Sequence, residues 1–469
     1  MRPGERWHVI GMAGSGAAGA ALMCHASGAV VDGCDAGGPS PYSVPLESAG
    51  VRLLVGHDPA HLAGVDRVAI SPAIRAQGGN AELAVAEQAG IPIATWQALL
   101  GELMHDRLGL AVTGTHGKST TTALLGHLLA HAGFDPAVAV GAYVPAWGAS
   151  VRIGGGTPFV VEADEFGDNF LHYRAAAAII TNVEMDHPDF FRDEAAVYSS
   201  FTRFVEGLLA DERLPGSPVL VAAADDPGID AVLARVPGWA GRVIRYAGRE
   251  RSGADVSPSR VEYSSGGSRF RVFERMFETT LAGEHNVSNC VAALTVAREL
   301  GASLDDLVAG LATFAGAGRR MELIGEPAGV AIYDDYAHHP TEVRATIAAA
   351  RQRLGARRLW AVFEPHMFSR TALFLDAFGQ AFAGADEVVI ADIFASRDVD
   401  TTVTSAEELA GVVERSSGIP TIATGDADAT AAYVADHVRQ GDAVLVMGAG
   451  VSYRIARGIA AHLESGVRA

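Results

Sequence analysis

Lysine is almost absent from this chain of 469 residues. Among its 36 lysine and arginine residues, Lys118 is the one lysine and all others are arginine. A basic residue that can be exchanged freely would follow this bias. Lysine and arginine are not equivalent, however, where a compact point charge must meet a phosphate. Lys118 is therefore the first residue for which the sequence predicts a specific role.

Cysteine, long apolar runs and excess positive charge are also scarce. Cys24, Cys34 and Cys290 are scattered without CxxC spacing, so we expect a reducing, cytoplasmic location and no cysteine metal site. No apolar run reaches the roughly 20 residues that span a bilayer, and the N-terminal residues lack the pattern of a secretory signal. The net charge of −19 argues against nucleic acid or an anionic membrane as a partner.

Short apolar runs alternate with amphipathic stretches along most of the chain. This pattern is typical of α/β proteins whose mostly parallel sheets are covered by helices. The length exceeds that of a typical single domain, and the runs fall into three blocks, which we place at 1–105, 106–325 and 326–469. A hairpin-like run, RVEYSSGGSRFRVFE, lies late in the second block. The third block begins where glycine and proline interrupt the chain after GRRMELIGEPAG.

The segment around Lys118 has the layout of a phosphate-binding loop. A strand-like run, GLAVTG, precedes a short glycine loop and a helix-like run that opens with Lys118 and Ser119. In such loops, backbone N–H groups hold phosphate oxygens, the lysine reaches the β- and γ-phosphates, and the hydroxyl can bind Mg²⁺. Val112 stands where the strict GxxxxGK[ST] pattern has glycine, and an exposed lysine at a helix start is the alternative. We expect ATP phosphates to contact Gly114, Thr115, His116, Gly117, Lys118, Ser119 and Thr120.

Acidic residues follow two further strand-like runs. The carboxyl ends of parallel strands meet at one edge of a sheet, which here would also hold the phosphate-binding loop. Mg²⁺ takes oxygen ligands and needs one or two carboxylates. Acidic residues after strands can also cap helices, but two such clusters behind this loop favour a metal site. The clusters comprise Glu162, Asp164 and Glu165 in FVVEADEF, and Glu184, Asp186, His187 and Asp189 in TNVEMDHPD.

The N-terminal segment carries a second glycine loop. Gly11, Gly14, Gly16 and Gly19 follow one strand-like run and open a helix-like run. The GxGxxG spacing is a weak signal, because many dinucleotide-binding enzymes share it. A nicotinamide-dependent oxidoreductase would carry this loop too, although such an enzyme explains neither Lys118 nor the acidic strand ends.

Seven motifs occur in one order along the chain, namely GTHGKSTTT, EADE, TNVEMDHPD, GEHNVSN, GRRMEL, DDYAHHPTE and FEPHMFSRT. As a set they closely resemble the Mur ligases of peptidoglycan synthesis, and best the branch that joins L-alanine to UDP-N-acetylmuramate. The resemblance covers nearly the whole chain and implies a Rossmann-like N-terminal domain, a central P-loop ATPase domain and a C-terminal Rossmann-like α/β domain. It also implies ATP-dependent amide-bond formation through an acyl phosphate, with Mg²⁺.

The resemblance also implies roles for individual residues. Catalysis would depend on Lys118, Glu162 and His187, and Mg²⁺ would bind Ser119, Glu162 and His187. Besides the phosphate-binding loop, the nucleotide would contact Asn286, Asn289, Arg320 and Asp335. The UDP-sugar would contact Gly14, Ser15, Gly16, Asp35, His57 and Ser71. L-alanine would bind near His338, His366 and Arg370, with Arg370 the partner of its carboxylate because Met367 stands where some relatives have arginine.

Two alternative functions are also compatible with these motifs. A recycling ligase that joins a preformed murein tripeptide to UDP-N-acetylmuramate shares most central motifs, although FEPHMFSRT and ADIFASRD favour a single amino acid. A nucleotide-sensing protein without catalysis is the other alternative, and intact Lys118, Glu162 and His187 argue against it. The sequence leaves monomer and homodimer equally open.

Overall fold

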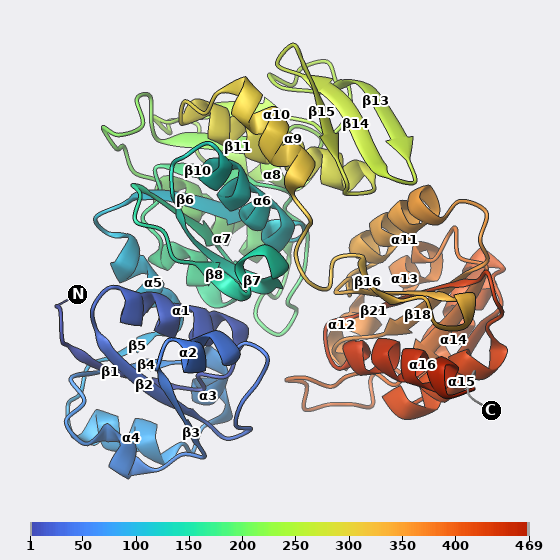
Figure 1. Ribbon diagram of the computed structural model, residues 1–469, viewed down its shortest axis with the longest axis horizontal. Helices are drawn as coiled ribbons and strands as arrows, with labels where there is room; N and C mark the ends of the chain where they lie inside the picture. Colours follow the sequence, from blue (N-terminus) through green and yellow to red (C-terminus); the bar gives the residue numbers. More distant parts are fainter. Residues whose placement is uncertain (1, 467–469) are drawn as a thin grey trace.

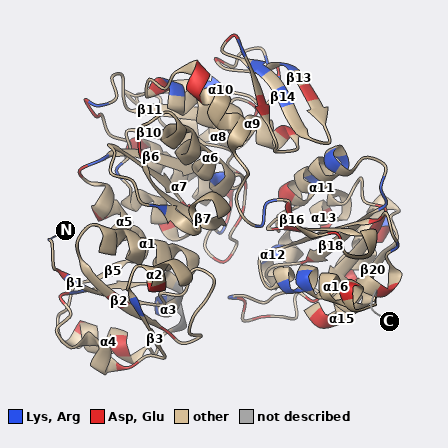
Figure 2. Cartoon of the chain, in the orientation of Figure 1, with Lys and Arg blue, Asp and Glu red and all other residues tan. Residues whose placement is uncertain are grey.

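Three large β-sheets with their helices, and one small additional sheet, organise the chain into an N-terminal, a central and a C-terminal unit (Figure 1). The computed structural model describes residues 2–466. Among these residues, no helix has the length and apolar character that crossing a membrane requires. Acidic and basic residues are interspersed over all three units (Figure 2). The predicted α/β class with mostly parallel sheets is confirmed.

The N-terminal unit is a five-stranded parallel sheet in the order β3-β2-β1-β4-β5. The strand order reverses between β1 and β4, and ligands of open α/β sheets bind at the carboxyl ends beside such a reversal. The glycine loop after β1 lies there. The strands are β1 Arg6–Ile10, β2 Val30–Asp35, β3 Arg52–Val55, β4 Arg67–Ile70 and β5 Ile93–Thr95, and the helices are α1 Ser15–Ala26, α2 Val44–Ser48, η1 Pro59–Leu62, α3 Pro72–Gln77, α4 Ala81–Gln88 and α5 Trp96–Met104.

The central unit contains a seven-stranded sheet in the order β12-β11-β10-β6-β9-β7-β8, which is parallel except for the β7–β8 pair. β6, which leads into the phosphate-binding loop, therefore lies between β9 and β10. The strands are β6 Leu108–Thr113, β7 Ala137–Val144, β8 Ala149–Arg152, β9 Pro158–Glu162, β10 Ala177–Ile180, β11 Val219–Ala223 and β12 Arg242–Tyr246. The helices are α6 Lys118–His131, η2 Pro145–Trp147, η3 Phe166–His172, α7 Glu194–Glu206, α8 Pro227–Leu233, α9 Glu284–Glu299 and α10 Leu304–Thr313.

A small antiparallel sheet extends the central unit. The predicted hairpin forms β13 Ser259–Ser264 and β14 Gly267–Val272, and β15 Arg275–Thr279 adds a third strand that the sequence pattern did not indicate. A Cβ at Gly267 would lie 1.9 Å from the carbonyl oxygen of Thr279, so this turn requires glycine.

The C-terminal unit has a six-stranded sheet in the order β16-β17-β21-β18-β19-β20, in which β16 alone is antiparallel. β16 precedes residue 326 yet pairs with β17, so this sheet starts earlier than the third sequence block. The strands are β16 Glu322–Gly325, β17 Ala331–Asp335, β18 Leu359–Glu364, β19 Glu387–Ala391, β20 Thr421–Gly425 and β21 Ala443–Gly448. The helices are η4 Pro327–Gly329, α11 Pro340–Leu354, α12 Phe368–Leu373, α13 Leu375–Ala381, α14 Ala406–Ser417, α15 Ala427–His437 and α16 Ser452–Gly466.

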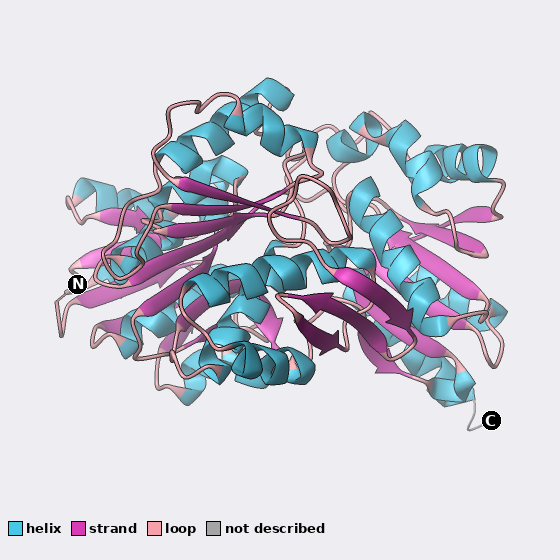
Figure 3. Ribbon diagram, turned by 90° about the horizontal axis from the view of Figure 1, so that it is seen from above, coloured by secondary structure: helices cyan, strands magenta, loops and turns pink. Residues whose placement is uncertain are grey.

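One large apolar core runs through the N-terminal and central units, a smaller cluster lies within the N-terminal unit alone, and the C-terminal unit has two clusters of its own. α1 packs on β7 and β8 so closely that a Cβ at Gly19 would lie 2.6 Å from the Val151 side chain. Ser150 Oγ also donates a hydrogen bond to the carbonyl oxygen of Ser15 at 3.0 Å. In the C-terminal unit, helices cover both faces of the sheet (Figure 3). The first two units are thus held together by apolar packing.

Candidate active site

The phosphate-binding loop joins β6 to α6 and depends on two glycines. Gly114 has a φ of +132° and Gly117 a φ of +79°, both in the region that favours glycine. A Cβ at Gly114 would lie 2.1 Å from Thr181 Oγ1. Val112 is fully buried within β6, where it contributes to the sheet core and not to the loop. Its departure from the strict loop pattern therefore leaves the turn intact.

The side chain of Lys118 folds back over this loop. Its ammonium donates hydrogen bonds to the carbonyl oxygens of Gly114 and Thr115, at 2.8 and 3.2 Å, and to Glu165 Oε2 at 2.8 Å. Asp164 Oδ1 lies 3.6 Å from it. Burial alone would lower the pKa of Lys118, but the surrounding carboxylates outweigh burial and raise it. A charged ammonium thus stands at the N-terminus of α6, where a helix also favours anions.

Ser119 and Glu162 bring two oxygen donors together beside the lysine. Ser119 Oγ donates a hydrogen bond to Glu162 Oε1 at 2.9 Å, and the backbone N–H of Gly141 donates to Glu162 Oε2 at 2.6 Å. Arg320, which precedes the C-terminal sheet, reaches Ser119 Oγ at 3.3 Å. One hydroxyl and one carboxylate are the protein ligands that Mg²⁺ takes in many nucleotide sites.

His187 follows β10 and faces the acidic cluster that follows β9. Its ligand atom lies within 4.8 Å of those of Asp164 and Glu165. The residue has a φ of +52°, and its ring packs on Phe166 with the centroids 5.0 Å apart. Burial lowers the pKa of His187, so the imidazole is neutral and keeps a lone pair. Because β9 and β10 flank β6, the two acidic strand ends meet at the phosphate-binding loop as predicted.

The residues expected at the amino-acid pocket approach from the C-terminal unit. Arg370 is 1% exposed, and its Nε donates a hydrogen bond to Asp186 Oδ1 at 2.8 Å. Its Nη1 lies 2.9 Å from His366 Nδ1, and the rings of His366 and His338 are 5.8 Å apart. Burial lowers the pKa of His338 to about 4 and that of His366 to about 2, so both rings are neutral. The Arg370–Asp186 ion pair ties the C-terminal unit to the central one.

One cleft of about 1040 Å³ connects these groups. It reaches from the glycine loop of the N-terminal unit, past the phosphate-binding loop, to the C-terminal unit. Its volume suits a ligand larger than a single nucleotide, since pockets for drug-sized molecules have roughly 300–1,000 Å³. Of the expected site residues, those lining the cleft are Gly14, Ser15, Gly16, Thr115, Gly117, Lys118, Ser119, Glu162, His187, Arg320, His338, His366 and Arg370.

Three residues expected beside the nucleotide lie just behind the cleft wall. Asp335 is buried, and its carboxylate accepts hydrogen bonds from the backbone N–H groups of Met321 and Ala337, so it holds the segment that carries Arg320. Asn289 packs on the phosphate-binding loop, since a Cβ at Gly117 would lie 2.8 Å from its Oδ1. Asn289 Nδ2 also donates to Asn286 Oδ1 at 3.2 Å. Gly114, His116 and Thr120 likewise do not line the cleft.

The structure places three expected UDP-sugar residues outside the cleft lining. Asp35 accepts a hydrogen bond from the backbone N–H of Ala13 at 3.1 Å, so it braces the glycine loop. His57 points elsewhere, with its Nδ1 3.0 Å from Glu82 Oε2. Ser71 begins α3, and its side chain makes no capping hydrogen bond there. The sugar-binding roles of these residues stay predictions.

His116 connects the phosphate-binding loop to the C-terminal unit. Its Nδ1 lies 3.3 Å from Glu342 Oε1, its Nε2 lies 3.6 Å from Glu184 Oε2, and its ring packs on His339 with the centroids 4.5 Å apart. Burial alone would lower the pKa of His116, but Glu342 and Glu184 outweigh burial and raise it to about 10. A buried, protonated histidine thus lies between two carboxylates from different units.

This raised pKa predicts how stability changes with pH. Because the folded pKa of about 10 exceeds the usual 6.5, the stabilisation by protonated His116 is complete below pH 6.5 and is lost as pH rises through 10. We expect the free energy of unfolding to fall more steeply across this window in wild type than in His116→Gln. Urea titrations at a series of pH values measure both slopes, with exposed His131→Gln as the control. Equal slopes in wild type and His116→Gln would contradict the assignment.

Three groups at the site were not among the expected site residues. Glu165 and Asp186 belong to the acidic clusters that the sequence pattern indicates, but their partners, Lys118 and Arg370, appear only in the fold. Arg397 also lines the cleft, with its guanidinium 4.4 Å from the centre of the Phe166 ring. Arg397 belongs to the segment ADIFASRD, but the sequence pattern predicts no contact for it, because its packing on Phe166 joins the loop after β19 to η3 of the central unit.

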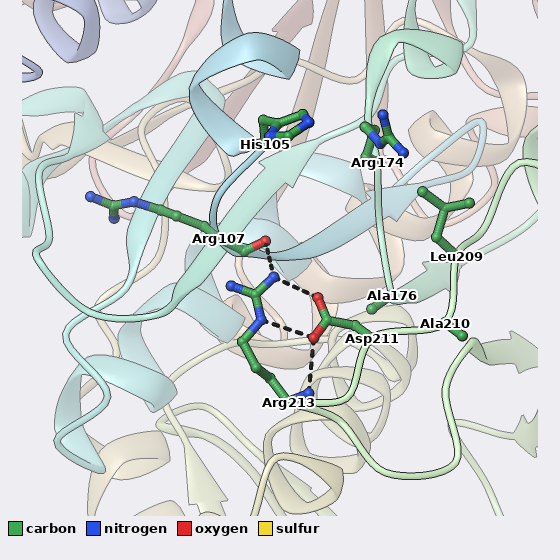
Figure 4. Close-up of a pocket in the computed structure, with 8 residues that line it drawn as sticks. All are labelled: His105, Arg107, Arg174, Ala176, Leu209, Ala210, Asp211 and Arg213. Carbon is green, nitrogen blue, oxygen red and sulfur yellow. Dashed lines mark hydrogen bonds and ion pairs between the residues drawn. The ribbon is translucent and has the colours of Figure 1, made fainter. Parts of the chain in front are cut away.

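A second, smaller cavity lies away from this site (Figure 4). It has a volume of about 200 Å³ and is lined in part by His105, Arg107, Arg174 and Arg213, near the starts of β6 and β10. Arg213 is already paired with Asp211 and with backbone carbonyl oxygens of the segment before β6. The cavity is smaller than the cleft, and its Arg213 side chain already has hydrogen-bond partners. It lies at the opposite edge of the sheet from the phosphate-binding loop.

Comparison with known proteins yields three family models that together cover most of the chain. Residues 6–108 match the model described as Mur ligase family, catalytic domain. Residues 112–297 match the Mur ligase middle domain, and residues 319–450 match the model described as Mur ligase, glutamate ligase domain.

Relatives and solved structures agree with these models. The UDP-N-acetylmuramate–L-alanine ligase of Mycolicibacterium vanbaalenii is 38% identical, over 98% of this chain and 97% of that protein. The ligase of the same name from Kineococcus radiotolerans is 40% identical, over 95% and 93%.

Two crystal structures also match over almost the whole chain. The UDP-N-acetylmuramate–alanine ligase of Thermotoga maritima has a TM-score of 0.79 at 22% identity, covering 98% of this chain and 99% of that one, which shows the shared fold. A murein peptide ligase of Psychrobacter arcticus has a TM-score of 0.71 at 27% identity with the same coverage. The match to the relatives spans both chains nearly end to end, and the family models cover the site as well as the fold. The chain belongs to the Mur ligase family.

Proposed function

We propose that the chain is an ATP-dependent ligase that joins L-alanine to UDP-N-acetylmuramate in peptidoglycan precursor synthesis, releasing ADP and phosphate. The cleft of about 1040 Å³ carries this proposal, because it joins the glycine loop of the N-terminal unit, Lys118 of the central unit, and histidine and arginine side chains of the C-terminal unit. The L-alanine ligases among the relatives support a single amino acid as the acceptor, in preference to a murein tripeptide.

The chemistry requires activation of a carboxylate. A carboxylate does not react with an amine at neutral pH, because its carbon is a poor electrophile and has no good leaving group. Transfer of the γ-phosphoryl group of ATP to the carboxylate of the sugar forms a P–O bond and breaks the bond to ADP. The amine then attacks the acyl phosphate, loses a proton, and phosphate leaves. Both steps build negative charge on oxygen, which preorganised donors stabilise.

We propose a position for each reactant. The N–H groups of the phosphate-binding loop and the Lys118 ammonium hold the β- and γ-phosphates, with Arg320 on the opposite side. The glycine loop at Gly14–Gly16 receives the diphosphate of the UDP-sugar. Arg370 and the neutral His338 and His366 form the part of the cleft that binds L-alanine. There a neutral imidazole can accept the proton of the incoming ammonium.

Mg²⁺ fits the oxygen donors of this site. Ser119 Oγ and Glu162 Oε1 approach within 2.9 Å, and the buried Nδ1 of His187 has no hydrogen-bond partner among residues 2–466. We propose that Ser119, Glu162 and His187 hold Mg²⁺. When bound, the ion neutralises charge on the phosphate oxygens. The protein orients these donors, and the hydrogen bond from the Gly141 N–H fixes the orientation of the Glu162 carboxylate.

Glu162→Gln tests the metal assignment. The variant keeps the shape of the side chain and removes its charge, and the affinity of oxygen sites follows the charge of their ligands. We expect the Mg²⁺ concentration for half-maximal phosphate release to rise by about tenfold or more. Glu322→Gln, which changes a carboxylate that also lines the cleft, serves as the matched control. An unchanged Mg²⁺ dependence in Glu162→Gln would place the metal elsewhere.

We further propose the ranges 1–105, 106–325 and 326–469 as the UDP-sugar, ATP and amino-acid domains, and a cytoplasmic location. The family assignment does not distinguish a monomer from a homodimer, and a sedimentation measurement would decide between them.

A panel of acceptor amines tests the proposed function. Phosphate release is measured with UDP-N-acetylmuramate, ATP and Mg²⁺ while L-alanine, L-serine, glycine or a murein tripeptide is offered in turn. We expect L-alanine to give the highest kcat/KM and a ligated product of matching mass. Preference for the tripeptide would establish the recycling ligase instead, and release that no amine stimulates would exclude a ligase of either kind.

A further inference from the structure

Polar side chains converge inside the N-terminal unit, away from the cleft. His8 comes from β1, Cys34 from β2, His61 from η1 and Glu82 from α4. His8, Cys34 and Glu82 are fully buried, and none of the four lines the cleft. Buried groups of this kind need partners, because an isolated charge or donor in the interior is costly.

The donor atoms of these four side chains already lie close together. All of them lie within 4.8 Å of one another. His8 Nε2 is 3.4 Å from Cys34 Sγ and 3.6 Å from Glu82 Oε1, and His61 Nδ1 is 2.6 Å from the same oxygen. In a tetrahedral zinc site, bond lengths of 2.0–2.3 Å separate neighbouring donors by roughly 3.2–3.8 Å. To reach this spacing, His61 Nδ1 and Glu82 Oε1 would move apart, and any pair near the 4.8 Å limit would move closer together.

A carboxylate behind His8 gives independent support. His8 Nδ1 lies 2.8 Å from Asp32 Oδ1, and Asp32 is held in turn by Arg52 at 3.1 Å. With the Nδ1 proton donated to Asp32, the lone pair of Nε2 faces Cys34 and Glu82. Metal-binding histidines are commonly oriented by a carboxylate in this way.

The charge and softness of the donors define the cation. A thiolate and a carboxylate together balance a divalent ion, and two imidazoles complete four ligands. Sulfur and nitrogen donors favour Zn²⁺ and similar borderline ions over Mg²⁺. A site closed by four protein ligands is typical of a structural metal and not of a catalytic one.

We propose that His8, Cys34, His61 and Glu82 bind one Zn²⁺-like divalent cation that ties β1, β2, η1 and α4 together. Partly exposed His57 covers this site, with its Nδ1 3.2 Å from Cys34 Sγ. From the sequence alone we expect no metal site that contains cysteine. The proposed donors come from four separate segments, and no CxxC spacing marks them.

Cobalt serves as the probe of the site. Full-length protein with its purification tag removed is titrated with Co²⁺, and its metal content is also measured after growth with zinc. We expect about one equivalent of metal per chain, a thiolate-to-cobalt charge-transfer band in the near ultraviolet, and the intense visible bands of tetrahedral cobalt. Zn²⁺ should displace the cobalt and raise the thermal midpoint of unfolding, since it binds the folded chain.

Matched cysteine variants give the decisive comparison. Cys34→Ser should lose the charge-transfer band, whereas Cys290→Ser, which changes another buried cysteine, should retain it. His61→Gln, at a partly exposed position, tests the site with less risk to folding and should lower the affinity for Co²⁺ at least tenfold. A wild-type protein that shows neither the band nor a zinc-dependent thermal shift would overturn the proposal. These readouts do not depend on ligase activity. The oxygen-rich Mg²⁺ site cannot produce a thiolate-to-cobalt charge-transfer band.

Discussion

Lys118→Ala is expected to lower kcat for phosphate release by about 10³-fold, because removing one preorganised donor from a charged transition state costs 10²–10³ or more. The ammonium donates hydrogen bonds to Glu165 Oε2 and to two loop carbonyl oxygens, so three acceptors fix its position beside the loop. Lys118→Arg should fail almost as severely, since a planar fork cannot occupy the place of a compact charge inside this loop. Steady-state rates at saturating substrates measure both effects.

The control separates catalysis from folding. Removing the ammonium leaves Glu165 buried without its partner, and such a loss destabilises a protein. The double variant Lys118→Ala/Glu165→Gln removes both charges and should recover thermal stability without recovering activity. Near wild-type kcat in either lysine variant would contradict the role of Lys118.

Arg370→Ala is expected to raise the KM for L-alanine by roughly 10- to 100-fold, the equivalent of a hydrogen bond to a charged group. The same change should cost roughly 3–5 kcal/mol of stability, because it leaves Asp186 buried without its counter-charge. Burial alone would raise the pKa of Asp186, but neighbouring positive charge, including the Arg370 guanidinium, outweighs burial and holds this pKa well below its usual value. Amino-acid titrations of initial rate and denaturant unfolding measure the two effects separately.

The double variant Arg370→Met/Asp186→Asn distinguishes binding from docking of the C-terminal unit. Removing both charges should restore most of the stability, while the KM for L-alanine stays high because the carboxylate has still lost its partner. A KM that returns to the wild-type value together with stability would show that Arg370 only positions the C-terminal unit.

The fold follows from the sequence where the strands are long and apolar. β6, β10, β18 and β21 are almost continuous apolar runs, which is the pattern of strands buried on both faces of a parallel sheet. The sequence pattern did not indicate β7, β8, β16 or β20, which lie at or next to sheet edges and mix glycine, threonine or charge with apolar residues. Their structure depends on pairing with neighbours, which no local pattern encodes.

Some features of the site could be predicted from the sequence, and others could not. Lys118, Ser119 and the acidic strand ends could be predicted, because a glycine loop and parallel strand ends impose a local geometry. The Gly141 N–H that orients Glu162 could not, because a backbone donor has no side-chain signal. The pairing of Arg370 with Asp186 joins residues 184 positions apart and depends on how two units dock.

The most direct test of the proposed mechanism follows oxygen from the sugar carboxylate into phosphate. UDP-N-acetylmuramate labelled with ¹⁸O in its carboxylate is converted with ATP, Mg²⁺ and L-alanine, and the masses of the products are measured by mass spectrometry. If an acyl phosphate forms, we expect one labelled oxygen to leave in inorganic phosphate, with ADP as the other product. Label in AMP together with release of pyrophosphate would contradict it, since the carboxylate would then be activated by adenylate transfer and not by the γ-phosphoryl group that Lys118 holds.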